Sequence, residues 1–246
     1  MLTLDQALSR DVILHSTAMK IVRKSFRVNY QANFPRPASG LVTQTPKLLE
    51  GILESLGDQF PPRARDVKIR SGASLDDWLI QIYLFNYLGK IELTAEGIRC
   101  SFERLVTDSD LSVVTQVLEC LTTALAAHSP TQGYSSEAVS GSVTYEVLDG
   151  AESRSAYLGE ISFRGKSSAH FDVGIKTRLK HSSQPVIGMF EVSPNWANKN
   201  ELFFWFDVET TSLKEMDLPK RAQVANELVL QALDSFGLEV IEAVKQ

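Results

Sequence analysis

The chain has 246 residues, 43% hydrophobic and 22% charged, and these ordinary globular proportions exclude extensive disorder and collagen-like or coiled-coil architectures. Its net charge of −5 divides into +5 over residues 1–70 and −10 over the other 176, and this acidic majority opposes bulk attraction to nucleic acid or to anionic membranes. With no run of eighteen apolar residues, no secretory signal pattern at the start and only two cysteines, we expect a reduced, cytoplasmic protein without a transmembrane helix or a membrane partner.

The first part of the chain predicts a strand, a helix, several strands and a second helix. Alternating apolar residues predict a strand over 19–33, which ends at the proline-rich segment that follows. Thr45 and Pro46 favour the start of a helix, and Gly57 favours its end. The next strands are short and closely spaced, so we expect antiparallel hairpins over 67–71, 78–87, 90–94 and 98–105. A second amphipathic helix is predicted over 110–127.

The pattern then begins again after a predicted linker at 129–136, which is rich in loop-forming residues. Five further strands are predicted, over 142–148, 156–164, 169–180, 186–192 and 201–210. An amphipathic helix with Pro219 in its first turn is predicted over 218–236. We therefore predict an α+β fold with two topologically similar halves, residues 1–130 and 137–246. Long amphipathic helices would pack on one face of antiparallel sheets, which are either separate or continuous.

Two of the predicted strands, 78–87 and 201–210, have apolar side chains on both faces. A half-exposed antiparallel strand normally alternates with polar residues, so these two strands need cover on both sides. Helices and the other half of the chain would provide that cover if the aromatic residues belong to the core. Alternatively, one aromatic face binds a protein partner or a second copy, because Trp, Tyr and Phe are enriched at interfaces. The residues assigned to that face are Trp78, Tyr83, Phe85, Phe203 and Trp205.

Basic residues give a weaker alternative, the binding of nucleic acid. One cluster surrounds Arg23 and Arg27, and another contains Arg63, Arg65 and Arg70. The two clusters would meet and contact phosphates if their segments were neighbouring strands. In the competing interpretation they are solvated edges, or they pair with the acidic second part of the chain.

Catalytic signatures are scarce in the sequence. It contains no Gly-x-Ser-x-Gly elbow, no phosphate-binding loop and no dinucleotide-binding glycine motif. A metal-dependent hydrolase is a further alternative, because His170 and Asp172 share one face of a predicted strand and Asp207 and Glu209 share a face of another. Otherwise these four residues occupy the solvated face of a sheet. We predict a protein that is not an enzyme and that has no cofactor.

Two segments carry a resemblance to known proteins. Phe26-Arg-Val-Asn-Tyr30 leads to Phe34-Pro35, and Leu202-Phe-Phe-Trp-Phe-Asp-Val-Glu209 precedes a helix that closes at Phe236. In this order of elements the chain resembles a sporadically distributed prokaryotic family of uncharacterised two-part α+β proteins. The resemblance implies a sheet-and-helix fold and a non-enzymatic role linked to prokaryotic defence, and it transfers no catalytic residue. We therefore predict action by protein–protein binding, as a homo-oligomer or as a subunit of a larger assembly.

Overall fold

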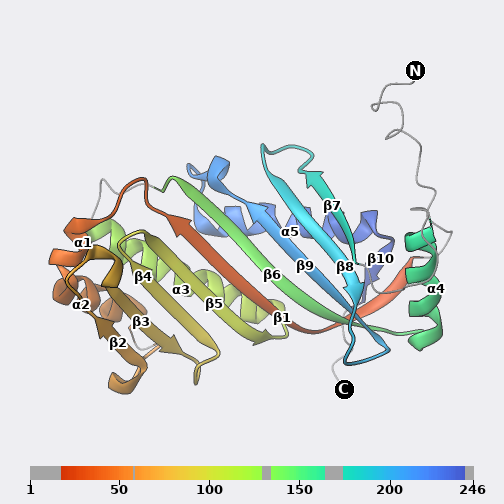
Figure 1. Cartoon of the computed structure of the whole chain (residues 1–246), viewed down its shortest axis with the longest axis horizontal. Helices are drawn as coiled ribbons and strands as arrows, with labels where there is room; N and C mark the ends of the chain where they lie inside the picture. The colour runs from red at the N-terminus through yellow and green to blue at the C-terminus, as the bar shows by residue number, and fades with distance from the viewer. Residues whose placement is uncertain (1–17, 58, 129–133, 164–173, 242–246) are drawn as a thin grey trace.

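A computed structural model describes residues 18–57, 59–128, 134–163 and 174–241 and shows one 10-stranded sheet with helices beside it (Figure 1). The strands are β1 (Met19–Asn33), β2 (Val67–Arg70), β3 (Leu79–Leu84), β4 (Gly89–Thr94), β5 (Gly97–Leu105), β6 (Ser136–Val147), β7 (Ile175–Lys180), β8 (Ile187–Pro194), β9 (Glu201–Glu209) and β10 (Leu238–Val240). The helices are α1 (Ser39–Thr43), α2 (Thr45–Leu56), α3 (Asp108–His128), α4 (Gly150–Phe163) and α5 (Leu218–Ser235). The predicted α+β class is confirmed.

The sheet is continuous from one end of the molecule to the other. Its strand order is β2-β3-β4-β5-β1-β6-β9-β8-β7, and every neighbouring pair on this path is antiparallel. The short β10 lies parallel to β1 and pairs with its first residues. Because β1 pairs with β5 on one side and with β6 on the other, the strand nearest the N-terminus lies at the centre of the sheet.

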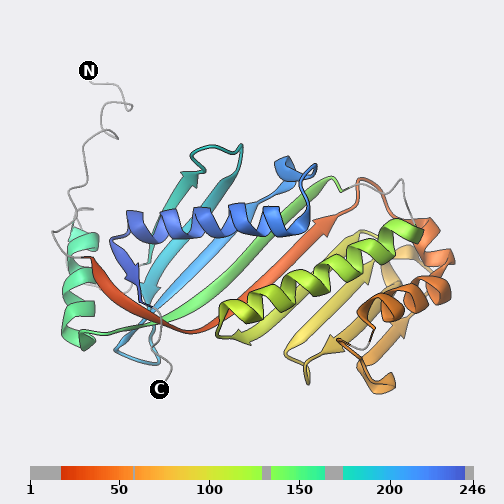
Figure 2. The ribbon, with the colours of Figure 1, turned by 180° about the vertical axis from the view of Figure 1, so that it is seen from behind.

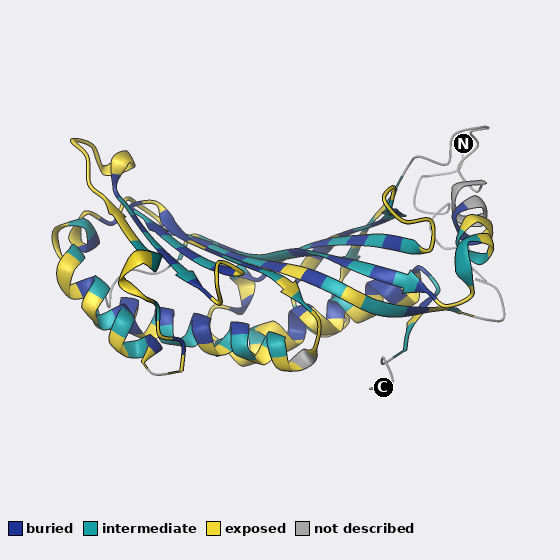
Figure 3. Cartoon of the chain, turned by 90° about the horizontal axis from the view of Figure 1, so that it is seen from below, coloured by how far each residue is buried: buried dark blue, intermediate teal, exposed yellow. Residues whose placement is uncertain are grey.

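Alternate residues along the strands face in opposite directions, and the helices lie over the more buried side. Leu202, Phe204 and Val208 of β9 are fully buried, whereas Phe203, Trp205 and Asp207, which alternate with the buried residues, are partly exposed. In Figure 2 the helices α2, α3 and α5 lie in front of the sheet, where α3 packs on β5 and α5 on β7 and β8. Figure 3 shows the same alternation of buried and partly exposed residues along the strands, and none of the helices in the described part of the chain covers the upper side of the central strands.

Helix α4 corrects one element of the prediction. The strand expected over 156–164 is wrong, because the residues from Gly150 to Phe163 form a helix at the end of the sheet (Figure 1). Tyr157 and Leu158 are adjacent and both buried, which an alternating strand does not allow. The hydroxyl of Tyr157 donates to the carbonyl oxygen of Phe236 at 2.9 Å, so the helix is fixed to the end of α5. Residues 169–173 of the next predicted strand lie outside the described residues.

Helix α3 meets a criterion of length and mean hydropathy for a transmembrane helix, whereas the sequence analysis looked only for uninterrupted runs of apolar residues. Its residues Ser109–His128 form a stretch of 20 residues that is long and apolar enough to cross a membrane by length and composition. Counting only uninterrupted apolar residues was therefore too strict. In this structure Val117 and Leu121 are fully buried and α3 packs on α2 and β5, so the apolar face of the helix forms part of the core.

Candidate functional site: the open face of the sheet

The side of the sheet opposite α3 and α5, which we call the open face, carries side chains in continuous cross-strand rows. This side of the sheet is turned to the viewer in Figure 1, and one row on it crosses eight strands. In strand order from β3 to β7 it contains Tyr83, Lys90, Ser101, Asn29, Ser140, Asp207, Met189 and Arg178. The middle of this row is small and polar, whereas its two ends carry aromatic, charged and apolar side chains. The candidate binding residues on the open face therefore lie at its two ends, one near β3 and the other across β7, β8 and β9.

The five aromatic residues selected from the sequence do not form one surface. Trp78 is 2% exposed and its indole N–H donates to Thr45 Oγ1 at 2.8 Å, so it belongs to the core and cannot contact a partner. Tyr83 lies on the open face of β3, and Phe85 follows it in the turn. Phe203 and Trp205 lie on the open face of β9, five strands away. At a spacing of about 4.8 Å per strand this separation is about 24 Å.

The aromatic residues near β3 contact one another and their neighbours. Tyr83 lies 5.0 Å from Tyr87 between ring centroids, and Lys68 Nζ lies 5.1 Å from the centroid of Tyr83. Phe85 packs edge-on against Phe60 at 5.8 Å. The turn itself has positive φ angles of 53° and 72° at Phe85 and Tyr87, which residues other than glycine adopt infrequently. These rings shape the hairpin between β3 and β4.

At the other end of the sheet, three cross-strand rows begin with a basic residue, and in the third of them Lys176 forms an ion pair with Glu191 at 3.1 Å. Each row begins with a basic residue on β7, and two of the three continue with an apolar residue on β8 and an acid on β9. The rows are Lys180–Ile187–Glu209, Arg178–Met189–Asp207 and Lys176–Glu191–Trp205, which together we call the β7–β9 patch. Ile187 and Met189 are 37% and 40% exposed, so apolar surface lies between the positive and negative columns.

The Asp207 carboxylate lies partly buried in the β7–β9 patch. Burial raises the pKa of Asp207 above its ordinary value, and the negative charge of Glu209 raises it further. On the strands beside it are Ser140 and Met189, neither of which carries a positive charge. Ionised Asp207 is therefore less favourable in the isolated chain than it would be with a cation nearby.

The basic residues proposed to contact nucleic acid are not brought together. Strands β1 and β2 are separated by β3, β4 and β5, a distance of about 19 Å at the usual strand spacing, so the condition for a joint basic surface is not met. Arg27 lies on the open face and forms an ion pair with Glu103, whereas Arg23 points to the helix side. The others, Arg63, Arg65 and Arg70, are exposed near β2 at the edge of the sheet.

The residues proposed to bind a metal are only partly described. Asp207 and Glu209 share the open face of β9, as expected, while His170 and Asp172 lie outside the described residues. Within the described part of the chain, no three His, Cys, Asp or Glu side chains gather as metal ligands would. His181 is buried and its Nε2 lies 3.1 Å from Glu227 of α5, while its Nδ1 accepts the backbone N–H groups of Ser183 and Gln184.

No protein-family model and no curated protein sequence matches the chain.

Two features of the structure were missed by sequence reasoning. The first is the basic column of β7, although the alternation of Lys176, Arg178 and Lys180 was a readable signal that one strand face is positive. The second is a groove between α3 and α5 on the helix side, lined by residues from both ends of the sequence. No pattern along the chain indicates this groove, because it depends on how far apart the two helices lie.

Proposed function

We propose that this chain is an assembly protein that binds a second copy of itself through the β7–β9 patch. The observation that carries the proposal is the order of charges across the patch, from a basic column on β7 to an acidic pair on β9 with exposed apolar residues between them. A surface that is complementary to itself favours a closed two-fold dimer, the commonest symmetric assembly.

The geometry of such a dimer follows from the strand order. A rotation of 180° about an axis along β8 exchanges β7 with β9 and keeps every row at its own level. Two sheets packed face to face with aligned strands lie about 10 Å apart. Asp207 of one copy then faces Arg178 of the other. Glu209 faces Lys180 in the same way, and Met189 meets its own counterpart on the axis.

The same arrangement provides a role for one of the aromatic residues selected from the sequence. Trp205 lies in the row of Lys176, so the rotation places the indole of one copy opposite the ammonium group of the other. A cation over an indole face is attracted by the ring quadrupole. Trp205 would therefore serve as the aromatic anchor at the border of the patch, with Phe203 next to it on β9.

Association through the edges of the sheet is less favourable than association through this face. Both outer strands carry alternating basic residues, Lys68 and Arg70 on β2 and Lys176, Arg178 and Lys180 on β7. Basic residues on an edge strand oppose pairing with another edge of the same kind, because like charges meet. The open face is thus the favoured surface for a second copy.

Mass measured by light scattering over a concentration series tests the proposal. The wild-type chain should be a dimer, and Trp205→Ala should raise the dissociation constant about 30-fold, the effect of losing a hot spot worth ~2 kcal/mol. Tyr87→Ala is the matched control, because Tyr87 is 56% exposed but lies at the far end of the sheet. A wild-type chain that stays monomeric at high concentration would refute the proposal.

Charge reversal gives the sharpest test, because it depends on which residues face each other. Arg178→Asp places two acids opposite each other in its own dimer, and Asp207→Arg places two bases opposite each other. Each variant alone should therefore be monomeric. An equimolar mixture should form dimers again, since both cross-pairs are then opposite in charge. Failure of the mixture to associate, with both variants folded, would rule out this orientation.

We also propose that the chain consists of two equivalent units, as the sequence pattern predicts for 1–130 and 137–246. Each would begin with a long strand, β1 or β6, and end with a long helix, α3 or α5. Support comes from the antiparallel pairing of β1 with β6 at the centre and from the meanders that extend outward from both strands. One chain would then already contain two paired units, and the β7–β9 patch would join two such chains.

A further inference from the structure

Strand β2 ends the sheet on the side away from the β7–β9 patch, and its outer edge has no neighbouring strand in the described part of the chain (Figure 1). Its four residues pair with β3, and among the described residues no other backbone group bonds to them. In an antiparallel pair, alternate residues direct both the N–H and the C=O group to the same neighbour. Two of the four β2 residues therefore direct these groups outward, where an extended peptide can pair with them.

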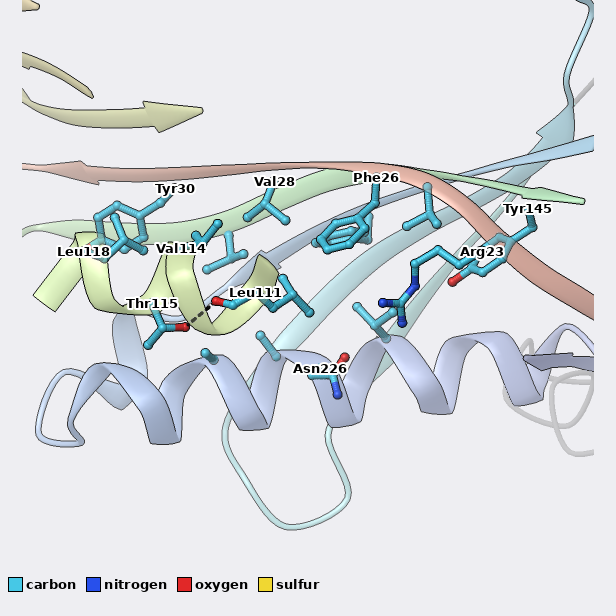
Figure 4. A pocket seen from close by; sticks show the side chains of 16 residues that line it. Arg23, Phe26, Val28, Tyr30, Leu111, Val114, Thr115, Leu118, Tyr145 and Asn226 are labelled. Carbon is cyan, nitrogen blue, oxygen red and sulfur yellow. Dashed lines mark hydrogen bonds between the residues drawn. The ribbon is translucent and has the colours of Figure 1, made fainter. Parts of the chain in front are cut away.

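An apolar row on the helix side of the sheet continues into β2 but loses its cover there. Ile69 of β2 pairs with Ile80 of β3, and the row continues through Leu93 and Ile98. These three partners are at most 1% exposed, whereas Ile69 is 51% exposed. At the centre of the sheet, side chains on the same side, such as Phe26, point toward α3 and α5 and are buried (Figure 4). A strand added beside β2 would place its own side chains about 5 Å from Ile69 and cover it.

The opposite side of β2, on the open face, is basic. Lys68 and Arg70 lie there, and the ammonium group of Lys68 is 5.1 Å from the centroid of Tyr83. Residues 63–70 include four basic residues and one acid, a net charge of +3 in a chain whose net charge is −5. Neither Lys68 nor Arg70 forms an ion pair with a described residue. Their charges are therefore available to a partner of the opposite sign.

We propose that the outer edge of β2 binds an acidic, extended segment of a partner protein as an additional strand. Backbone hydrogen bonds to a sheet edge hold such a segment, and its alternate side chains contact the two sides of the sheet. Acidic side chains would face Lys68 and Arg70 on the open face, and an apolar side chain would cover Ile69 on the helix side. The same basic residues oppose pairing with β2 of a second copy, so the edge favours a partner of different sequence.

Nucleic acid would satisfy fewer of these features. Phosphate groups would attract Lys68 and Arg70, but they would leave Ile69 exposed and would not bond to both the N–H and the C=O groups of the edge. The ring of Tyr83 already contacts Lys68 and, at 5.0 Å between centroids, Tyr87, whereas bases stack on open aromatic rings. A peptide strand is therefore the favoured occupant.

Calorimetric titration of the whole chain with a synthetic peptide tests the proposal. The probe alternates glutamate with valine over seven residues and is uncharged at both ends. It should bind in a one-to-one ratio, while the same peptide with lysine in place of glutamate should bind at least tenfold more weakly. Replacing the valines by proline keeps the charge but removes backbone N–H donors, and it should weaken binding to a similar extent. Equal binding of the proline peptide, or no binding of the probe to the folded chain, would overturn the proposal.

Charge reversal on β2 locates the site. Lys68→Glu combined with Arg70→Glu should weaken binding of the acidic probe at least tenfold and should strengthen binding of the lysine peptide. Lys199→Glu combined with Lys214→Glu is the matched control, because it changes the net charge equally at exposed positions on either side of β9. An equal loss in both double variants would mean that the net charge governs binding, and it would refute the assignment to β2.

Amide hydrogen exchange shows where and how the peptide is held. With the acidic probe bound, exchange at the outward-facing amides of Val67–Arg70 should slow, and exchange in β7, the other basic edge strand, should not change. Ile69→Ser should weaken the probe by about two- to fivefold, because one cross-strand apolar contact is lost. Slower exchange in β7 alone would place the site elsewhere. Slower exchange in β2 with oligothymidylate but not with the peptide would assign the edge to nucleic acid and contradict the proposal.

Discussion

Arg221 in the first turns of α5 donates a hydrogen bond to the carboxylate of Glu137 near the start of β6, and Glu137 is only 2% exposed. The hydroxyl of Thr210 also donates to this carboxylate, at 3.3 Å. Arg221 in turn donates to the carbonyl oxygens of Met216 and Lys214 at 2.7 and 2.8 Å. This ion pair therefore fixes the beginning of α5 to the centre of the sheet.

Removing the cation from this pair should destabilise the chain strongly. Arg221→Met leaves the Glu137 carboxylate buried without its charge partner, and the free energy of unfolding should fall by about 3–5 kcal/mol. Urea denaturation followed by circular dichroism measures the change. Lys24→Met, which breaks an exposed ion pair with Glu146, serves as the control and should have little effect. An unchanged urea midpoint in Arg221→Met would mean that the pair is solvated.

The buried indole of Trp78 gives a second prediction. Its N–H donates to Thr45 Oγ1, and Thr45→Val removes the acceptor while keeping the shape of the side chain. An unsatisfied buried donor costs about 1–3 kcal/mol, so thermal unfolding should occur at a lower temperature. Thr43→Val is the control, because the Thr43 hydroxyl is exposed and bonds only within its own helical turn. Equal losses in both variants would show that the indole bond contributes little.

Local signals in the sequence predicted most elements of the fold. The alternation over 19–33 and the prolines after it marked β1 at the bounds that the structure has, and Thr45 with Pro46 marked the start of α2. The segment of α4 was mistaken for a strand because its few large apolar residues are confined to its second half, so that no apolar stripe runs along the whole helix. Continuity of the sheet could not be predicted, because it depends on the long-range pairing of β1 with β6.

The candidate site was predicted less well than the fold. Phe203 and Trp205 were selected by composition and do lie on the open face, whereas Trp78 was selected by the same argument and lies in the core. Composition cannot distinguish the two faces of a strand when both are apolar. The pairing of Arg178 with Met189 and Asp207 in one row is a property of register across three strands, which no local pattern contains.

Asp207 should affect monomer stability and self-association in opposite directions. Its pKa is raised in the folded chain, so the folded state holds a proton where the unfolded state has lost it, and stability falls as pH rises through this pKa. Asp207→Asn removes that penalty and should make the monomer slightly more stable at neutral pH. In the dimer it removes two charge pairs with Arg178, and the dissociation constant should rise about 30-fold for a loss of ~1 kcal/mol per pair.

The effects of Asp207→Asn on monomer stability and on self-association are measured in two different variants of the chain. Monomer stability is compared in chains that also carry Trp205→Ala, between pH 4 and pH 7 taken as a range around the ordinary carboxylate values. The stability gain from Asp207→Asn should shrink toward the acidic end, where Asp207 is protonated. Self-association is measured by light scattering without the tryptophan substitution. A gain in both stability and association would mean that Asp207 faces no cation in the dimer.

Gly141 of β6 has no room for a larger residue, because β1 and a phenylalanine ring lie close to it. A Cβ atom there would lie 2.3 Å from the carbonyl oxygen of Arg27 and 2.6 Å from the ring of Phe206, so β1 and β6 would have to separate. Gly141→Ala should therefore lower the free energy of unfolding by about 1–3 kcal/mol in urea denaturation. Ser140→Ala, on the open face of the same strand, is the control and should stay near wild type.

A second substitution separates the two contacts of Gly141. Phe206→Leu shortens the side chain that a new methyl group would meet, but it leaves the carbonyl oxygen of Arg27 in place. If the backbone contact dominates, Gly141→Ala should remain destabilising when it is introduced into Phe206→Leu, and the two losses should add. A full rescue by Phe206→Leu would instead show that only the ring opposes the methyl group, and that β1 and β6 can move apart at little cost.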